Sequence, residues 1–134
     1  MALLGRDTAV TGPFPKGVLL LETLRGSEAL GMPYLFDVAL LSKDAVIAAD
    51  DVIGKPLAVG IKLNAGAERF FHGIVTDFRK LGVTRLHTRY LARLQPQLSL
   101  FDHTQDCRIF NEASQTALSI VKAVRSWAEQ PSSW

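Results

Sequence analysis

Three histidines are the first candidates for chemistry in this chain. They are His72, His87 and His103, and the third lies in the segment DHTQDC together with Asp102, Asp106 and Cys107. A structural zinc site needs about four Cys, His or carboxylate ligands held in a tetrahedron. His103 and Cys107 are four positions apart, but no second pair with CxxC or HxxxH spacing supplies the other half of a site. The sequence therefore favours a solvated loop with one buried thiol over a metal centre.

Motifs for catalysis and for phosphate binding are missing as well. The strained GxSxG turn that presents a nucleophilic serine does not occur. The segment Gly54-Lys55-Pro56 is not a phosphate-binding loop, because proline follows the lysine and no glycine precedes it at the required spacing. A single cysteine excludes a disulfide within the chain. We therefore expect neither enzymatic activity nor a cofactor.

Composition sets further bounds on the function. The chain has 134 residues, of which 48% are hydrophobic and 21% charged, and its formal net charge is +2. This balance is typical of a globular domain, and the charge is too small to indicate a polyanionic partner. Arg6 and Asp7 interrupt the first apolar residues, and no apolar run approaches the ~20 residues that cross a bilayer. We expect no secretory signal peptide and no stable membrane insertion by this region.

A row of basic residues is the main candidate for a functional surface. On a strand from Arg85 to Gln95, alternation places Arg85, His87, Arg89 and Arg93 on one face and Leu86, Tyr90, Ala92 and Leu94 on the other. One interpretation is a solvated face that Asp77 or Glu68 partly neutralises across the hairpin. The other is a docking face for an acidic protein or, alternatively, for single-stranded nucleic acid on an OB-like barrel. Nucleic-acid binding usually requires exposed aromatic residues among the cations, so we expect a protein partner and no nucleic acid.

This row belongs to a long predicted hairpin, in which Arg69–Leu81 and Arg85–Gln95 are the arms and Gly82, Val83 and Thr84 form the turn. The first arm begins apolar on both faces. Alternation places Phe70, His72, Ile74, Thr76 and Phe78 on one face and Phe71, Gly73, Val75 and Asp77 on the other. A strand that is covered on one side does not need two apolar faces. We therefore expect Phe71 and Val75 to form an apolar interface with a helix, a neighbouring sheet or another subunit.

Alternating apolar residues predict the other elements. Strands are expected at 18–24, 34–41 and 57–63, with one further short strand possible around 8–10. The glycines and the proline of residues 26–33 predict a loop, and residues 45–53 predict one or two helical turns. From Ser114 to Ala128 the apolar period changes to that of an amphipathic helix, with Ser114 or Asn111 as N-cap and Pro131 as terminator.

These elements predict a mainly β protein, with a small antiparallel barrel or curled sheet of about five strands followed by an amphipathic helix. Closure of such a sheet also removes exposed strand edges. The chain divides into an N-terminal arm (1–16), the β-barrel (17–96), and a connecting segment with the first helix of a following region (97–134).

Four segments, in order along the chain, resemble the N-terminus of valine-glycine repeat protein G (VgrG), the spike of bacterial type VI secretion systems. They are LLLETLRGSEALGMPYLFDVALLS (19–42), DVIGKPLAV (51–59), RFFHGIVTDFRKLG (69–82) and DCRIFNEAS (106–114). Each motif is weak by itself, but their common order and spacing are specific. The resemblance implies a phage-tail-hub-like barrel that catalyses no reaction and forms the first part of a longer chain.

The resemblance also implies partners. Proteins of this kind form homotrimers, sit on the hexameric tube of the haemolysin-coregulated protein (Hcp) and carry secreted effectors into target cells. They reside in the bacterial cytoplasm before firing and leave through the contractile apparatus without a signal peptide. The tail hub of a contractile phage or of a tail-derived particle shares this pattern and is the alternative.

Overall fold

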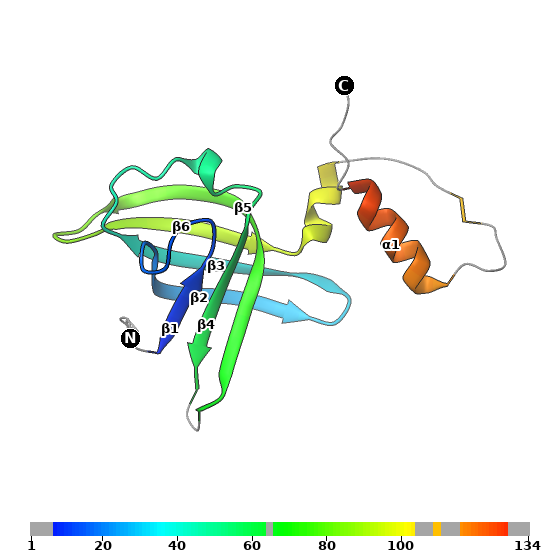
Figure 1. Cartoon of the computed structure of the whole chain (residues 1–134), viewed down its shortest axis with the longest axis horizontal. Coiled ribbons are helices and arrows are strands. Elements are labelled where there is room, and N and C mark those ends of the chain that lie inside the picture. Colours follow the sequence, from blue (N-terminus) through cyan, green and yellow to red (C-terminus); the bar gives the residue numbers. More distant parts are fainter. Residues whose placement is uncertain (1–6, 64–65, 104–108, 111–115, 129–134) are drawn as a thin grey trace. The chain divides into compact units, whose positions relative to one another are not determined.

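The computed structural model describes residues 7–63, 66–103, 109–110 and 116–128 (Figure 1). The chain forms two compact units, Met1–Ser99 and Leu100–Trp134. The first unit contains six strands: β1 (Thr8–Thr11), β2 (Leu20–Ala29), β3 (Met32–Ser42), β4 (Pro56–Lys62), β5 (Glu68–Val83) and β6 (Thr88–Gln95). They form one antiparallel sheet in the order β1-β4-β5-β6-β3-β2. The sheet curls into a half-barrel, which confirms the predicted fold class.

The strand count exceeds the prediction by one because the short segment near the N-terminus joins the sheet. β1 pairs with β4, so that Val10 lies opposite Val59. Both side chains contact the hydrophobic core. β1 and β2 are the two edge strands of the sheet.

The core lies on the concave face of the sheet. Its fully buried side chains come from four strands and from the segment after β3: Val38, Leu40, Val52, Leu57, Val59, Val75, Tyr90, Ala92 and Leu94. The ring of Tyr90 stacks on Phe78 with a centroid separation of 5.2 Å. Its hydroxyl donates to the carbonyl oxygen of Asp44 (2.9 Å) and accepts the N–H of Ile47 (3.3 Å). These bonds satisfy the polar end of a buried tyrosine and attach the segment after β3 to the core.

The loop predicted at residues 26–33 is wrong, because this segment is the end of a hairpin. β2 continues to Ala29, β3 begins at Met32, and only Leu30 and Gly31 lie between them. Gly31 has φ = 77°, and two-residue hairpin turns favour glycine because they require positive φ. Pro33 lies where β3 pairs with β2 alone, and its missing N–H is tolerated at such an edge.

The turn of the long hairpin lies further along the chain than predicted. β5 continues through Val83, and Arg85 and Leu86 form the tip of the turn. The N–H of Thr84 donates to the carbonyl oxygen of His87 (2.7 Å), and the N–H of His87 donates to Thr84 Oγ1 (3.2 Å). Leu86, which alternation placed with the core residues, is therefore exposed.

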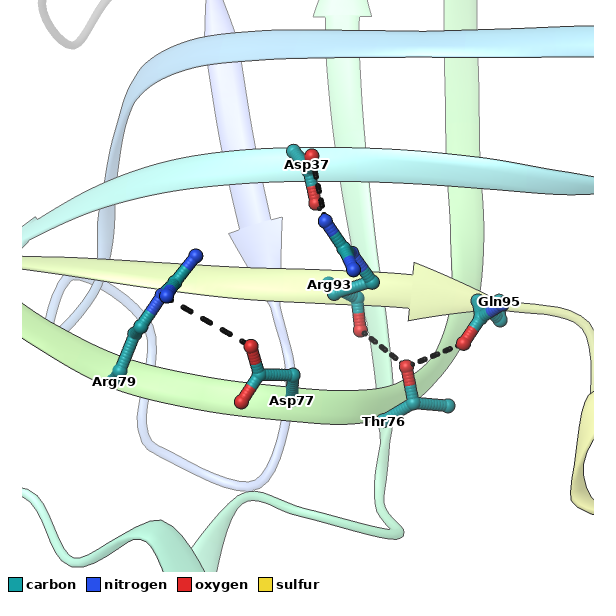
Figure 2. A network of polar contacts seen from close by, with 6 residues as sticks. All are labelled: Asp37, Thr76, Asp77, Arg79, Arg93 and Gln95. Carbon is teal, nitrogen blue, oxygen red and sulfur yellow. Dashed lines mark hydrogen bonds and ion pairs between the residues drawn. The ribbon is translucent and has the colours of Figure 1, made fainter.

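A β-bulge changes the alternation of β5. The pairing with β6 shifts between Val75 and Asp77, so that Val75 and Phe78 are both buried although simple alternation placed them on opposite faces. The hydroxyl of Thr76, at the bulge, donates to Gln95 Oε1 at 2.7 Å (Figure 2). The bulge thus keeps both halves of a 16-residue strand in contact with one curved core.

The helical segments of the described residues include the 3₁₀ helices η1 (Ala49–Asp51) and η3 (Gln97–His103) and the α-helix α1 (Ala117–Ala128). η1 falls within the predicted helical turns, and α1 confirms the predicted amphipathic helix. The proposed N-caps Ser114 and Asn111, the terminator Pro131 and the Cys107 segment lie outside the described residues. Within the described residues, no helix is long and apolar enough to span a membrane.

Candidate docking surface

The predicted docking face is divided between two environments. Arg89 and Arg93 lie in β6, on the convex face of the sheet, whereas Arg85 and His87 lie in the turn between β5 and β6. Arg85 is exposed and His87 is half-buried. The structure therefore brings two of the four residues together on the sheet and places the other two at the end of the hairpin.

Arg93 forms a bidentate ion pair with Asp37 of β3, the residue directly opposite it in the sheet. Its Nε lies 2.8 Å from Asp37 Oδ1, and its terminal nitrogen lies 3.2 Å from Oδ2 (Figure 2). Bidentate, charge-assisted pairs of this kind are among the strongest side-chain hydrogen bonds. The hydrogen bond from Arg93 holds the pKa of Asp37 below its usual value, and the same bond raises the pKa of Arg93.

Acidic and basic side chains continue this pattern on β5. Asp77 lies opposite Arg93 in the sheet, and Arg79 Nε lies 3.9 Å from Asp77 Oδ2 (Figure 2). Asp77, one of the two carboxylates expected to neutralise the row, adds a smaller electrostatic contribution to the raised pKa of Arg93. Glu68, the other, pairs with Lys62 in the register of β4 and β5, at the opposite end of β5 from the turn. The main partner of Arg93 is thus Asp37, 56 positions away in sequence.

Arg89 also has a carboxylate partner from a distant strand. Its Nε lies 2.9 Å from Glu22 Oε2, and Glu22 lies at the irregularity in β2 between Leu21 and Thr23. Because β3 lies between β2 and β6, the arginine side chain extends across β3. Leu41 of β3 lies opposite Arg89 and is buried although it belongs to the convex face. The arginine stem is therefore placed to shield apolar surface as well as to carry charge.

The two predicted interface residues contact the chain's own core. Val75 has no exposed surface. Phe71 is half-buried, packs edge-to-face against Phe36 with centroids 5.3 Å apart, and carries the guanidinium of Arg69 4.6 Å above its ring. The exposed aromatic side chain of this arm is Phe70, which is 61% exposed and lies against Gly60. Of the two residues predicted to contact a helix, a neighbouring sheet or another subunit, only Phe71 retains exposed surface.

An apolar group at the end of the hairpin was not predicted from the sequence. Leu81, Val83 and Leu86 are 48%, 69% and 79% exposed. Periodicity alone places Leu81 at the end of a strand, Val83 in a turn and Leu86 in the core, so it does not group the three side chains. The available signal was the segment KLGVTRL (80–86), in which aliphatic and basic residues alternate without an acidic residue.

Metal ligands do not gather in the described part of the chain, where no group of three His, Cys, Asp or Glu side chains is placed to hold an ion. The ring of His72 lies near Tyr34, with centroids 6.5 Å apart. His87 lies in the hairpin turn, and the side chain of His103 is outside the described residues.

A family model described as phage tail baseplate hub (GPD) matches residues 27–133, which include β3 to β6 and α1. The chain belongs to this hub family. The identification as a region like the N-terminal hub of VgrG is therefore confirmed at the level of the family.

Two similar relatives of this hub protein come from Pseudomonas aeruginosa PAO1. The type VI secretion system spike protein VgrG1a is 34% identical over 121 residues, which are 90% of this chain and 18% of the relative. The spike protein VgrG1b is 34% identical over 119 residues, which are 89% of this chain and 16% of the relative. The hub chain thus spans less than a fifth of the length of these curated relatives.

A solved structure is similar to this chain in fold, in agreement with the family model and with the two relatives. The E. coli c3393 protein, described as a component of the type VI secretion system with structural similarity to the T4 bacteriophage tail proteins gp27 and gp5, aligns with a TM-score of 0.56 and 25% identity. The match covers 93% of this chain and 29% of that protein. The curled sheet of the hub chain is therefore the fold of a tail or spike component.

Proposed function

We propose that this chain is the N-terminal part of a type VI secretion spike hub that docks on the Hcp tube and helps to deliver effectors into target cells. The observation that carries the proposal is the combination of the hub family match with 34% identity to two spike proteins. The curled sheet supports it, because the same fold occurs in a type VI secretion component. The role is mechanical, and this region catalyses no reaction.

The complete protein would be a homotrimer, with the Hcp tube protein and secreted effectors as partners. It would reside in the bacterial cytoplasm before firing and leave through the apparatus without a signal peptide. Within this chain, the proposed division is an arm (1–16), the hub barrel (17–96) and a connecting segment with the first helix (97–134), and strand β1 of the arm pairs with β4 of the barrel. Of the predicted docking face, Arg85 and His87 would contact the tube, while Arg89 and Arg93 are already paired within the chain.

The tail hub of a contractile phage or tail-derived particle is the second candidate. The observation in its favour is the family model itself, whose description is a phage tail baseplate hub. Single-stranded nucleic-acid binding loses its main motivation, since Glu22 and Asp37 offset the charge of Arg89 and Arg93.

The test begins with the coding frame. A frame that continues past Trp134 into a second barrel and short repeated β-strands is expected of a spike, whereas a stop at Trp134 contradicts the spike role.

In the bacterium, the full-length gene is then replaced by one that lacks residues 1–99, and Hcp is measured in the culture medium. Loss of Hcp release that the intact gene restores is the expected result. Undiminished Hcp release without these strands contradicts the proposal. Release of the hub protein only within phage particles favours the second candidate.

A further inference from the structure

The end of the β5–β6 hairpin extends past the strands that flank it. We call Lys80, Leu81, Val83, Arg85 and Leu86 the hairpin tip. On one side, β3 ends at Ser42, opposite Thr88, and on the other side the pairing with β4 ends at Ile74. Figure 1 shows this end of the hairpin projecting beyond the neighbouring strands. The tip is therefore accessible on both sides within the sheet unit.

The tip exposes aliphatic side chains on a rigid support. The exposed groups are Leu81, Val83 and Leu86. The turn that carries them is closed by main-chain and side-chain bonds between Thr84 and His87, including Thr84 Oγ1 to the His87 carbonyl oxygen at 2.8 Å. These three side chains lie within six positions of one another at the same end of the hairpin, and an exposed cluster of apolar groups is a common sign of an interaction site. A tip that is already ordered also loses little conformational entropy when it binds.

The charges of the tip distinguish it from the rest of the hairpin. Arg89 and Arg93 each contact a carboxylate, whereas neither Lys80 nor Arg85 lies within salt-bridge distance of one among the described residues. Lys80 instead donates to the carbonyl oxygen of Ala45 at 3.1 Å, next to the exposed side chain of Val46. The tip therefore presents aliphatic groups bordered by positive charge that the described chain does not offset.

We propose that the hairpin tip is the element by which this hub docks, and that it enters an apolar recess bordered by carboxylates on the partner protein. A few desolvated side chains at the centre of an interface supply most of its binding energy, and peripheral charges set partner choice and association rate. This inference rests on the proposed function, so the partner is the end surface of the Hcp tube. An anionic membrane fits less well, because the tip has no Trp or Tyr and the carboxylate residue Asp44 adjoins the segment that Lys80 contacts.

The test measures binding of this 134-residue chain to purified, immobilised Hcp from the same secretion system. The variant carries Val83→Asp and Leu86→Asp, and the control carries Leu30→Asp, which alters a still more exposed leucine at the turn between β2 and β3. Circular dichroism and thermal denaturation verify that all three proteins are folded. We expect the variant to bind about 10-fold or more weakly and the control to remain within about 2-fold of the wild type.

A second variant addresses the charge. Arg85→Glu is expected to weaken binding several-fold at low salt, with a smaller difference at high salt, because exposed charges are screened. Equal binding by the wild type and by the Val83→Asp, Leu86→Asp variant would overturn the role of the tip and leave hub docking intact. A wild-type chain that binds vesicles of phosphatidylglycerol through the tip and does not bind Hcp would overturn it in favour of a membrane contact.

Absence of any binding to Hcp would also overturn the inference. The proposed function is decided separately, by Hcp release from cells that carry the full-length spike. Release that depends on residues 1–99 but is unaffected by the two aspartates would keep the hub role and remove the role of the tip.

Discussion

The middle and the end of the β5–β6 hairpin use the same residue types in opposite ways. In the middle, Tyr90 and Leu94 are buried on the concave face, and Arg93 on the convex face is held by Asp37. At the end, Val83 and Leu86 are exposed, and Arg85 has no carboxylate partner among the described residues. A single hairpin thus combines a segment that stabilises the sheet with a segment whose contacts are available to a partner.

The difference arises from the neighbours of each segment. The middle of the hairpin is flanked by β3, which contributes Asp37 and a buried inner face, and β2 contributes Glu22. No described strand flanks the end. An arginine or leucine on this hairpin therefore stabilises the fold only where another strand lies beside it, and substitutions at matched positions should separate the two roles.

The largest contrast is expected from Leu94→Ala. Its side chain is fully buried, so truncation should lower the free energy of unfolding by about 2–5 kcal/mol through lost burial and a cavity. The matched substitution at the tip, Val83→Ala, should change it by less than about 0.5 kcal/mol. Urea denaturation monitored by circular dichroism measures both, and equal effects would contradict the contrast.

Glycine substitutions should separate the two segments next. A Cβ at Gly73 would lie 2.8 Å from the carbonyl oxygen of Gln95 and 3.2 Å from Leu94 Cβ, so Gly73→Ala should destabilise the protein by about 1–3 kcal/mol. A Cβ at Gly82 would meet no atom within 4 Å, and Gly82→Ala should be neutral or slightly stabilising. Thermal denaturation of the two variants gives the comparison, and a Gly82→Ala protein that unfolds as readily as Gly73→Ala would contradict it.

The ion pair of the middle segment predicts a pH dependence. Asp37→Asn should cost about 1 kcal/mol at neutral pH, since Arg93 loses its charged partner at a partly exposed site. The pKa of Asp37 is lowered in the folded state, so the folded protein binds fewer protons at this group than the unfolded chain. The stabilisation is therefore complete above the usual pKa of aspartate and is lost as the pH falls through the folded value.

Urea denaturation at a series of pH values checks this sign. The difference between wild type and Asp37→Asn should begin to shrink below about pH 4, where this aspartate becomes protonated in the unfolded chain, and should vanish once the pH falls below the lowered pKa of folded Asp37. A difference that grows on acidification would contradict the role assigned to the pair. Arg85→Gln serves as the control, because no carboxylate of the described chain depends on it.

Charge reversals give the smallest stability effect and sharpen the docking prediction. Arg85→Glu should alter the free energy of unfolding by less than about 0.5 kcal/mol, whereas Arg89→Glu places a carboxylate beside Glu22 and should cost more. If binding to Hcp is unchanged in the double variant Arg85→Glu, Arg89→Glu, the basic row has no role in docking. The single variants show whether a loss of binding reflects contact or stability.

Most of the fold could be predicted from periodicity, and the errors have local causes. The strands and α1 follow from alternating and helical spacing of apolar residues, and the four motifs identified the family. The bulge at Thr76 reversed the face of Phe78, because one extra residue changes every later position in a strand. The turn at Leu30 and Gly31 was predicted as part of a longer loop, because the glycines and the proline of residues 26–33 are typical of loops. The same residue types also occur in hairpins, and here they do.

The candidate surface depended more strongly on the tertiary structure. The sequence by itself determined that Arg89 and Arg93 share a face of one strand, since side chains alternate at a period of two. Only the tertiary structure decided that these charges are paired and that Leu86 is exposed. The physical reason is that ion-pair partners and burial come from strands distant in sequence, namely Glu22 and Asp37 for the charges and the absence of a described neighbouring strand for Leu86.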